Sequence, residues 1–579
     1  MTQLYDEIPE SLIQWIKKQH MFWVASAPLS PDGHVNLSPK GIGDCFHVVN
    51  SRRVWYQDLT GSGVETISHI RENGRVTILF NAFEGPPRIL RLYGQGTVYE
   101  YGTEEYESLI SPETRKPGSR AAVVIDVQQC QTSCGYAVPM YDFVTHRTQL
   151  LQWADTQESR TRALDTTSSP ETHQKGIRAY WVQNNLRSLD GLPGLLTAPD
   201  SNLMLVSNFD KEDQRSKLRY SSSSLREGRS QSSGANLAIG FALGALVATT
   251  VPYILSATRK FDVHVSSTKS SWPDARETLG SFIDIFDFPT VARAECKFTF
   301  FEHQGICTIL SMTHFYDEIP ESLIQWIKKQ HMFWVASAPL SPDGHVNLSP
   351  KGTADSFHVV NSRRVWYQDL TGSGVETISH IRENGRITIL FNAFEGPPRI
   401  LRLFGKGTVY EYGTEEYESL ISPETRKPGS RAAVVIDVHQ CQTTCGFAVP
   451  LYDFVTHRTQ LLRMADIKES CSRVSATISS PEIHPNGIQA YWVQNNLKSL
   501  DGLPGLLTAP DSKVTPVSNF DKEGQRPKLR YSSSSSREGR SQSSNANLAI
   551  GFALGALVAT TIPYILSATR KFDIFTTRA

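Results

Sequence analysis

The chain has little cysteine for its length and no excess of charge of either sign. Eight cysteines are spread over 579 residues, and 58 basic side chains balance 58 acidic ones. Balanced charge argues against a nucleic-acid-binding protein, which usually carries a strong basic excess. The recurring pairs Cys130/Cys134 and Cys441/Cys445 supply two thiolates each, whereas structural zinc needs four ligands, so we expect no metal site. Sparse cysteine and the lack of an apolar leader favour a reduced, cytosol-facing domain.

The most informative feature that is present is a duplication. Residues 1–262 align with 312–573 without a gap, and 226 of the 262 positions are identical. Solenoid repeats have periods of roughly 20–50 residues, so this period indicates a whole protein written twice. Two interpretations stay open: one two-domain polypeptide, or two adjacent genes joined in one sequence. In the second case the native protein runs near half of 64.6 kDa and lacks peptides from 263–311.

Each copy is predicted to be mainly β with short helices. Many short strands at close spacing, separated by turn residues, favour a barrel. In the first copy we expect strands at 21–27, 34–38, 53–59, 75–80, 89–99 and 121–127, and helices at 7–20, 64–71 and 103–110. The predicted domains are 1–196 and 312–507, followed by Ser/Arg-rich linkers at 197–234 and 508–546, transmembrane helices at 235–258 and 547–569, and a junction at 263–311.

One hydrophobic segment near the end of each copy is long enough to cross a membrane. Residues 237–257 and 548–568 each contain 21 residues without a charge, and a helix of this length spans about 30 Å. The alternative is a buried core helix. Basic residues before the segment predict a tail-anchored protein whose barrel faces the cytosol and whose helix contacts lipid. If both segments cross, however, the second domain lies on the opposite side of the membrane from the first.

Four short motifs follow one another in each copy. They are HVNLSPKG at 34–41, WYQDLTGSG at 55–63, RVTILF at 75–80 and RILRLYG at 88–94, with CGYAVP at 134–139. This ordered set resembles the pyridoxamine 5′-phosphate oxidase-like flavoproteins with an FMN-binding split barrel, in their fungal branch. The resemblance covers about residues 8–140. It implies FMN as cofactor, oxidoreductase activity, and two barrels paired either as a homodimer or within one chain.

The turn at 60–63 is the expected phosphate site. It precedes a predicted helix, whose exposed N–H groups and dipole favour an anion. Hydroxyls and basic side chains of the neighbouring motifs complete the cradle, whereas the simpler alternative is a capped helix start with a solvated Lys40. The candidate FMN-binding residues are Ser38, Lys40, Thr60, Ser62 and Arg91, and in the second copy Ser349, Lys351, Thr371, Ser373 and Arg402.

No catalytic residue follows from the sequence. The turn lacks the Ser-Arg-Lys typical of true pyridoxamine phosphate oxidases, so that activity is not expected here. The predicted function is a membrane-anchored FMN-binding oxidoreductase. The alternative is a non-catalytic, membrane-anchored binding or scaffold protein built on the same barrel.

Overall fold

The computed structural model describes residues 2–165, 176–201, 313–477, 484–512 and 514. Both copies fall in one unit that ends at Ser518. The predicted spans 237–257 and 548–568 lie outside the described residues, as do the junction 263–311 and most of both linkers. Within the described ranges, no helix is both long enough and apolar enough to cross a membrane.

Each copy is built on one antiparallel sheet of eight strands. The order is β3-β2-β6-β7-β8-β5-β4 in the first copy, with β1 beside β8, and the second copy repeats this order. The strands of the first copy are β1 (Gln3–Tyr5), β2 (Phe22–Ser26), β3 (Asn36–Lys40), β4 (Phe46–Asn50), β5 (Arg53–Leu59), β6 (Arg75–Asn81), β7 (Ile89–Glu100) and β8 (Ser119–Ser133). Those of the second are β10 (His314–Tyr316), β11 (Phe333–Ser337), β12 (Asn347–Lys351), β13 (Phe357–Asn361), β14 (Arg364–Leu370), β15 (Arg386–Asn392), β16 (Ile400–Glu411) and β17 (Ser430–Thr444).

The helices of each copy lie between the strands in sequence and follow the last of them. In the first copy α2 stops at Gly74, whose φ of 75° is a left-handed conformation that glycine adopts without strain. The helices are α1 (Glu10–Ile16), α2 (Glu65–Asn73), α3 (Glu104–Leu109), α4 (Gln149–Asp165) and α5 (Ile177–Asn184). Their counterparts are α9 (Glu321–Ile327), α10 (Glu376–Asn384), α11 (Glu415–Leu420), α12 (Gln460–Thr477) and α13 (Ile488–Asn495).

The prediction of a mainly β chain with short helices is confirmed in both copies. The strand at 53–59 has the predicted bounds, but β4 was not predicted and β8 runs further at its end. The larger difference is α4, a helix that is absent from the predicted elements. Leu150, Leu151 and Ala154 pack this helix into the core, and Glu158 further along it forms a buried ion pair with Arg115, just before β8.

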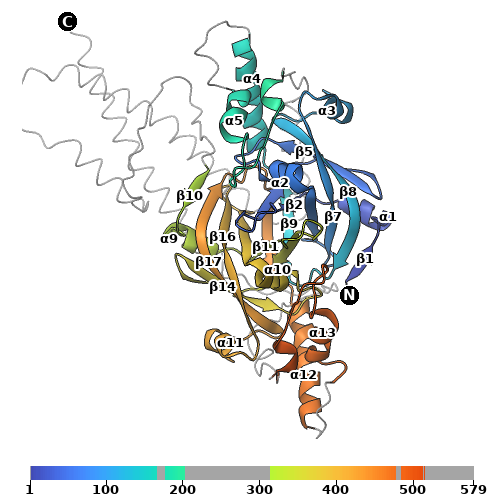
Figure 1. The fold of residues 1–579 in the computed structure, drawn as a ribbon, viewed down its shortest axis with the longest axis vertical. Coiled ribbons are helices and arrows are strands. Elements are labelled where there is room, and N and C mark those ends of the chain that lie inside the picture. The colour runs from blue at the N-terminus through green and yellow to red at the C-terminus, as the bar shows by residue number, and fades with distance from the viewer. Residues whose placement is uncertain (1, 166–175, 202–312, 478–483, 513, 515–579) are drawn as a thin grey trace, which may run out of the picture. The chain divides into compact units, whose positions relative to one another are not determined.

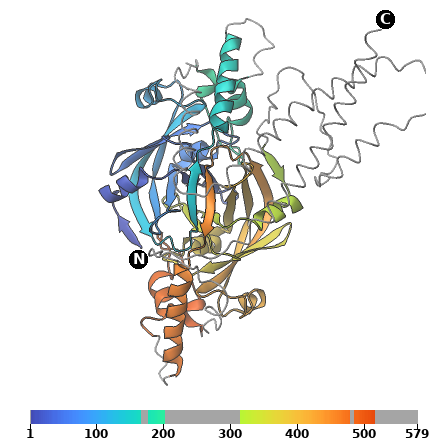
Figure 2. The ribbon, with the colours of Figure 1, turned by 180° about the vertical axis from the view of Figure 1, so that it is seen from behind.

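The two copies pair within the chain, as one of the two predicted arrangements requires. Strand β9 (Met140–Thr145) of the first copy pairs antiparallel with β18 (Leu451–Thr456) of the second. A single hydrophobic core contains residues of both copies, among them Trp23, Leu37, Trp334 and Leu348. Figure 1 and the reverse view in Figure 2 show the two sheets side by side, with α4 and α12 at opposite ends of the pair.

Reciprocal hydrogen bonds join the copies around this core. Thr77 Oγ1 donates to the carbonyl of Val346 over 2.6 Å, and Thr388 Oγ1 donates to that of Val35 over 2.7 Å. The guanidinium of Arg75 reaches backbone carbonyls of the second copy in the same way. Each of these donors is buried by the pairing, and the reciprocal bonds fix how the two copies face each other.

Candidate functional site

Two pockets lie where the copies meet, and each is built from both of them. The first site contains Lys40 and Ser62 of the first copy with Arg402 of the second, and encloses about 840 Å³ including its mouth. The second site contains Lys351 and Ser373 with Arg91, and encloses about 890 Å³. Both pockets are open at the surface and combine cations, hydroxyls and apolar side chains in one lining.

The structure groups the predicted residues differently from the sequence order. Four predicted residues of each copy line one pocket, but the predicted arginine crosses to the other pocket. Arg91 lies on β7, and its Nε donates to the carbonyl of Leu348 on β12 over 2.7 Å. The first site therefore contains Ser38, Lys40, Thr60, Ser62 and Arg402, and the second contains Ser349, Lys351, Thr371, Ser373 and Arg91.

The arginine of each site is largely buried, Arg91 more completely than Arg402, and its hydrogen bonds go to neutral groups. Arg402 donates to Leu37 O (2.8 Å), Ser38 Oγ (3.3 Å), Gln442 Oε1 (3.1 Å) and Thr444 Oγ1 (3.4 Å). Arg91 donates to Leu348 O (2.7 Å), Ser349 Oγ (3.2 Å), Gln131 Oε1 (3.3 Å) and Ser133 Oγ (3.2 Å). Burial lowers the pKa of Arg402 to about 10, although nearby Glu65 acts to raise it. The guanidinium is thus charged at neutral pH.

Lys40 is held by a buried carboxylate. Its Nζ lies 2.6 Å from Asp58 Oδ1, and Arg120 Nε lies 2.9 Å from Asp58 Oδ2. Burial disfavours the charged form of Asp58, but Lys40 and Arg120 outweigh this effect and lower the pKa of Asp58. Arg120 also donates to the carbonyl of Gly63 over 2.9 Å, which supports the turn. Lys40 is therefore positioned by an ion pair instead of being freely solvated.

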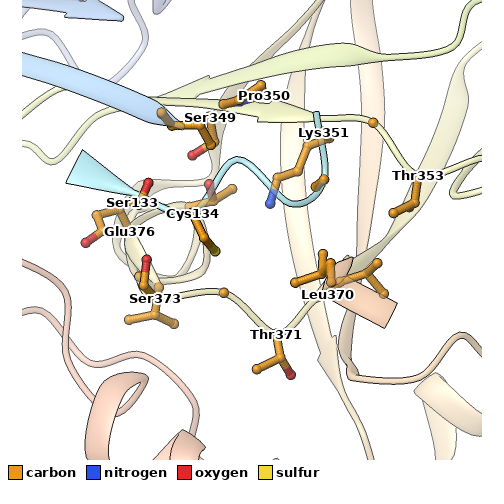
Figure 3. A pocket seen from close by; sticks show the side chains of 18 of the residues that line it. Ser133, Cys134, Ser349, Pro350, Lys351, Thr353, Leu370, Thr371, Ser373 and Glu376 are labelled. Carbon is orange, nitrogen blue, oxygen red and sulfur yellow. The ribbon is translucent and has the colours of Figure 1, made fainter. Parts of the chain in front are cut away.

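The two hydroxyls of the predicted phosphate turn have different roles. Thr60 Oγ1 donates to the carbonyl of Gly118 over 2.7 Å and accepts from Trp181 Nε1 over 2.8 Å, so it is occupied by the protein. Ser62 also lines the site. Figure 3 shows the equivalent pair in the second site, where Ser373 faces the space beside Cys134 and the hydroxyl of Thr371 turns away from Lys351.

Residues that the sequence did not single out hold the turn in place. Trp181 within α5 bonds to Thr60, and Asn185 directly after α5 bonds to the carbonyl of Gly61. Glu158 on α4 accepts from the backbone N–H of Gly118 over 2.7 Å. The aromatic pair at 180–181 is the sequence feature that could have indicated this contact, because a tryptophan within polar sequence usually packs against the rest of the domain. The partners themselves are set by the tertiary fold.

An acidic residue also lies at the turn. Glu65 begins α2 and lines the first site, and its Oε1 accepts from the backbone N–H of Leu189 over 3.3 Å. It shares the helix N-terminus with any anion bound there. The cations that line this site are Lys40, Arg120 and Arg402, and the carboxylates facing them are Glu65 and, behind the wall, Asp58. The site therefore keeps an excess of one positive charge.

Comparison with known proteins identifies the family. The profile of the pyridoxamine 5′-phosphate oxidase family matches residues 8–134 and 319–445. The pyridoxamine 5′-phosphate oxidase family protein ustO of Aspergillus flavus is 38% identical over 217 residues, which are 35% of this chain and 81% of that protein. The chain belongs to the pyridoxamine 5′-phosphate oxidase family. It contains two copies of the family domain, as the motifs predicted.

Solved structures of similar proteins are more distant. HupZ of Group A Streptococcus is 21% identical and matches 21% of this chain and 90% of its own, with a TM-score of 0.18. A putative pyridoxamine 5′-phosphate oxidase of Listeria innocua is 12% identical over 21% of this chain and 94% of its own, with a TM-score of 0.16. The FAD binding protein of Mycobacterium smegmatis is 14% identical over 22% of this chain and 96% of its own, with a TM-score of 0.17.

Proposed function

We propose that this family member is a flavoprotein that binds FMN in both interface pockets and acts as an oxidoreductase. The observation that carries the proposal is the buried arginine of each site. Arg402 and Arg91 donate only to neutral oxygens in the bonds described above. One carboxylate, Glu65 or Glu376, lines the same pocket as each arginine, but a lysine and a second arginine line it too. Buried cations are stabilised by a nearby anion, so each pocket is suited to an anionic ligand.

The residues present fit a flavin mononucleotide. Its phosphate carries about two negative charges, and Lys40, Arg402 and the Ser62 hydroxyl supply cations and a donor in the first site. Apolar side chains such as Leu59 and Phe447 line the rest of this pocket, where an aromatic ring system would be shielded from water. A bound flavin would supply the electron-accepting chemistry, and the protein would position it and set its electrostatics.

Flavin uptake by the purified full chain tests the proposal. We expect visible flavin absorbance in the protein as isolated or after addition of FMN, with two sites per chain. Replacing both buried arginines, Arg91→Met with Arg402→Met, removes charge-assisted hydrogen bonds and should weaken FMN binding about 10- to 100-fold.

The matched control is the same substitution at exposed arginines. Arg53 and Arg364 pair with Asp126 and Asp437 at the surface, with about half of each side chain exposed. Arg53→Met with Arg364→Met should leave FMN affinity unchanged. A full chain that stays colourless and does not take up FMN would refute the flavoprotein proposal. Thermal unfolding of each variant shows whether lost binding reflects lost folding.

Turnover separates an oxidoreductase from a binding or scaffold protein. We expect NADPH to reduce the bound flavin and an added acceptor to reoxidise it, both followed by flavin absorbance under anaerobic conditions. A bound flavin that a chemical reductant reduces but NADPH does not would favour the non-catalytic alternative.

We also propose that residues 548–568 anchor the chain in a membrane, with both domains in the cytosol. The uncharged run of 21 residues in the sequence supports this assignment. The two copies share one core, so they lie on the same side of any membrane, and a single crossing by 237–257 would separate them. The full chain should stay in the membrane fraction after alkaline extraction. The chain lacking 548–579 should instead be found in the soluble fraction. If the deleted chain stays membrane-bound, the assignment is wrong.

A further inference from the structure

The two sites have the same charged groups. Lys40, Arg120 and Glu65 of the first site correspond to Lys351, Arg431 and Glu376 of the second, and the arginine from the opposite copy is present in both. The buried carboxylate behind the lysine is also repeated, as the ion pair between Lys351 and Asp369 shows. An anionic group would therefore contact the same kinds of charged side chain in both sites.

The walls of the two sites differ in polarity. Ile42 and Cys45 line the first site, whereas Thr353 and Ser356 occupy the equivalent positions in the second. In the first copy, Ile42 and Cys45 belong to a buried apolar cluster with Leu59, Leu150 and Leu151, against which Phe447 of the second copy packs. In the second copy, Ser356 Oγ donates to the carbonyl of Thr353 over 2.8 Å.

The same positions also border a second cavity in each copy. Ile42 and Cys45 line a hollow that includes His20, His47 and His146, with about 1,110 Å³ including its mouth. Thr353 and Ser356 line the corresponding hollow of the second copy, with about 1,200 Å³. Residues 42 and 45, like 353 and 356, thus separate the interface pocket from a neighbouring cavity. In Figure 3, Thr353 lies beyond Lys351 at the edge of the second site.

We propose that the two sites are not equivalent and that these four residues determine the difference. The first site, walled by Ile42 and Cys45, binds the apolar part of its ligand more tightly. The second site, walled by Thr353 and Ser356, is the weaker one for the same ligand. The proposal rests on the proposed function, because flavin is the ligand in question. Because the charged groups of the two sites are the same, the difference in affinity should come from contacts with the uncharged part of the ligand.

Equilibrium titration of the full chain with FMN tests this inference. We expect two binding phases of one site each, separated by at least about tenfold in dissociation constant, because one methylene group in an apolar pocket changes affinity by about 10- to 200-fold. The double variant Ile42→Thr with Cys45→Ser should make both sites weak. The reverse double variant, Thr353→Ile with Ser356→Cys, should make both sites tight.

The two double variants act as controls for each other. Each introduces side chains that the other copy already accommodates in the same fold, so both should unfold at temperatures close to that of the unchanged protein. A single phase with two equal sites in the unchanged chain would overturn the inference while leaving the flavoprotein proposal intact. Two phases that neither variant merges would also overturn it. No FMN binding at all would instead refute the proposed function.

Discussion

Trp23 and Trp334 stack on each other across the interface between the two copies. Their ring centroids are 4.6 Å apart with an interplanar angle of 24°, and both side chains are fully buried. Each indole N–H donates to an asparagine of the opposite copy, Asn392 and Asn81, over 3.4 Å. The pair therefore joins the copies through both apolar contact and hydrogen bonds, in the middle of a core that neither copy completes alone.

Replacement of Trp23 by alanine should destabilise the whole pair. Loss of a large buried aromatic side chain typically costs about 3–5 kcal/mol, and here the cavity opens between the copies. Denaturant unfolding of the full chain measures the change. Val49→Ala, at a side chain that is 55% exposed, is the control and should change the free energy of unfolding by less than about 0.5 kcal/mol. Equal effects of the two variants would contradict the shared core.

Substitution of Thr60 should affect stability, whereas substitution of Ser62 should affect FMN binding. Thr60→Val leaves the buried Trp181 Nε1–H without its acceptor, which should cost about 1–3 kcal/mol of stability. Thr60→Ser keeps the hydroxyl and should recover most of this loss. Ser62→Ala should leave stability unchanged and weaken FMN binding. If Thr60→Val weakened binding without any loss of stability, Thr60 would be a ligand contact.

Glu158 should be among the most sensitive acidic positions. Glu158→Gln leaves the buried guanidinium of Arg115 without its counter-charge, and breaking such a pair typically costs about 3–5 kcal/mol. The loss should appear as a lower denaturant midpoint and as earlier proteolysis in α4. Glu7→Gln is the control, because the Glu7–Arg52 pair is more than half exposed and such pairs contribute at most about 1 kcal/mol.

Acid should destabilise the protein through two buried histidines. Burial lowers the pKa of His69, and equally that of His380, to about 4. The unfolded chain takes up these protons near pH 6.5, so the folded state loses stability as the pH falls from about 6.5 to about 4, by roughly 3 kcal/mol per histidine. Above pH 6.5 neither histidine contributes.

Unfolding free energies between pH 7.5 and 4.5 measure this effect. The double variant His69→Gln with His380→Gln should show a flatter dependence on pH over that window. Asp58 has a lowered pKa, so its contribution to stability is lost only below the normal range of a carboxyl group and falls outside the window. An unchanged slope in the double variant would show that other groups titrate instead.

Much of the fold was predictable because local patterns are strong in the strands. The alternating and β-branched segments at 53–59 and 75–80 form β5 and β6 within one residue of the expected bounds. Helix α4 was not predicted, since its apolar residues Leu150, Leu151 and Ala154 are confined to its start and the rest is polar, where a buried ion pair of Glu158 with Arg115 holds it. Strand β9 was equally hidden, because its partner β18 belongs to the other copy.

The candidate site was predictable in its residue types but not in its assembly. Lys40 and Ser62 come from neighbouring motifs and do line one pocket. Arg91 comes from the same run of motifs but lies in the other pocket, where it bonds to Ser349. No pattern in the sequence shows which side chains of β7 cross the interface, since that depends on how the two sheets face each other.

The amino-acid sequence by itself determined that the chain contains two copies of one domain, that each copy is mainly β, and which cations and hydroxyls are available for an anion. Only the tertiary structure decided that the copies share one core and that each pocket combines the turn of one copy with the arginine of the other. The physical reason is that the alternation of residues along a strand predicts which side chains lie on the same face of a sheet, but not what packs against that face. The partner of that face is chosen by burial of Trp23 against Trp334 and by the hydrogen bonds that surround them.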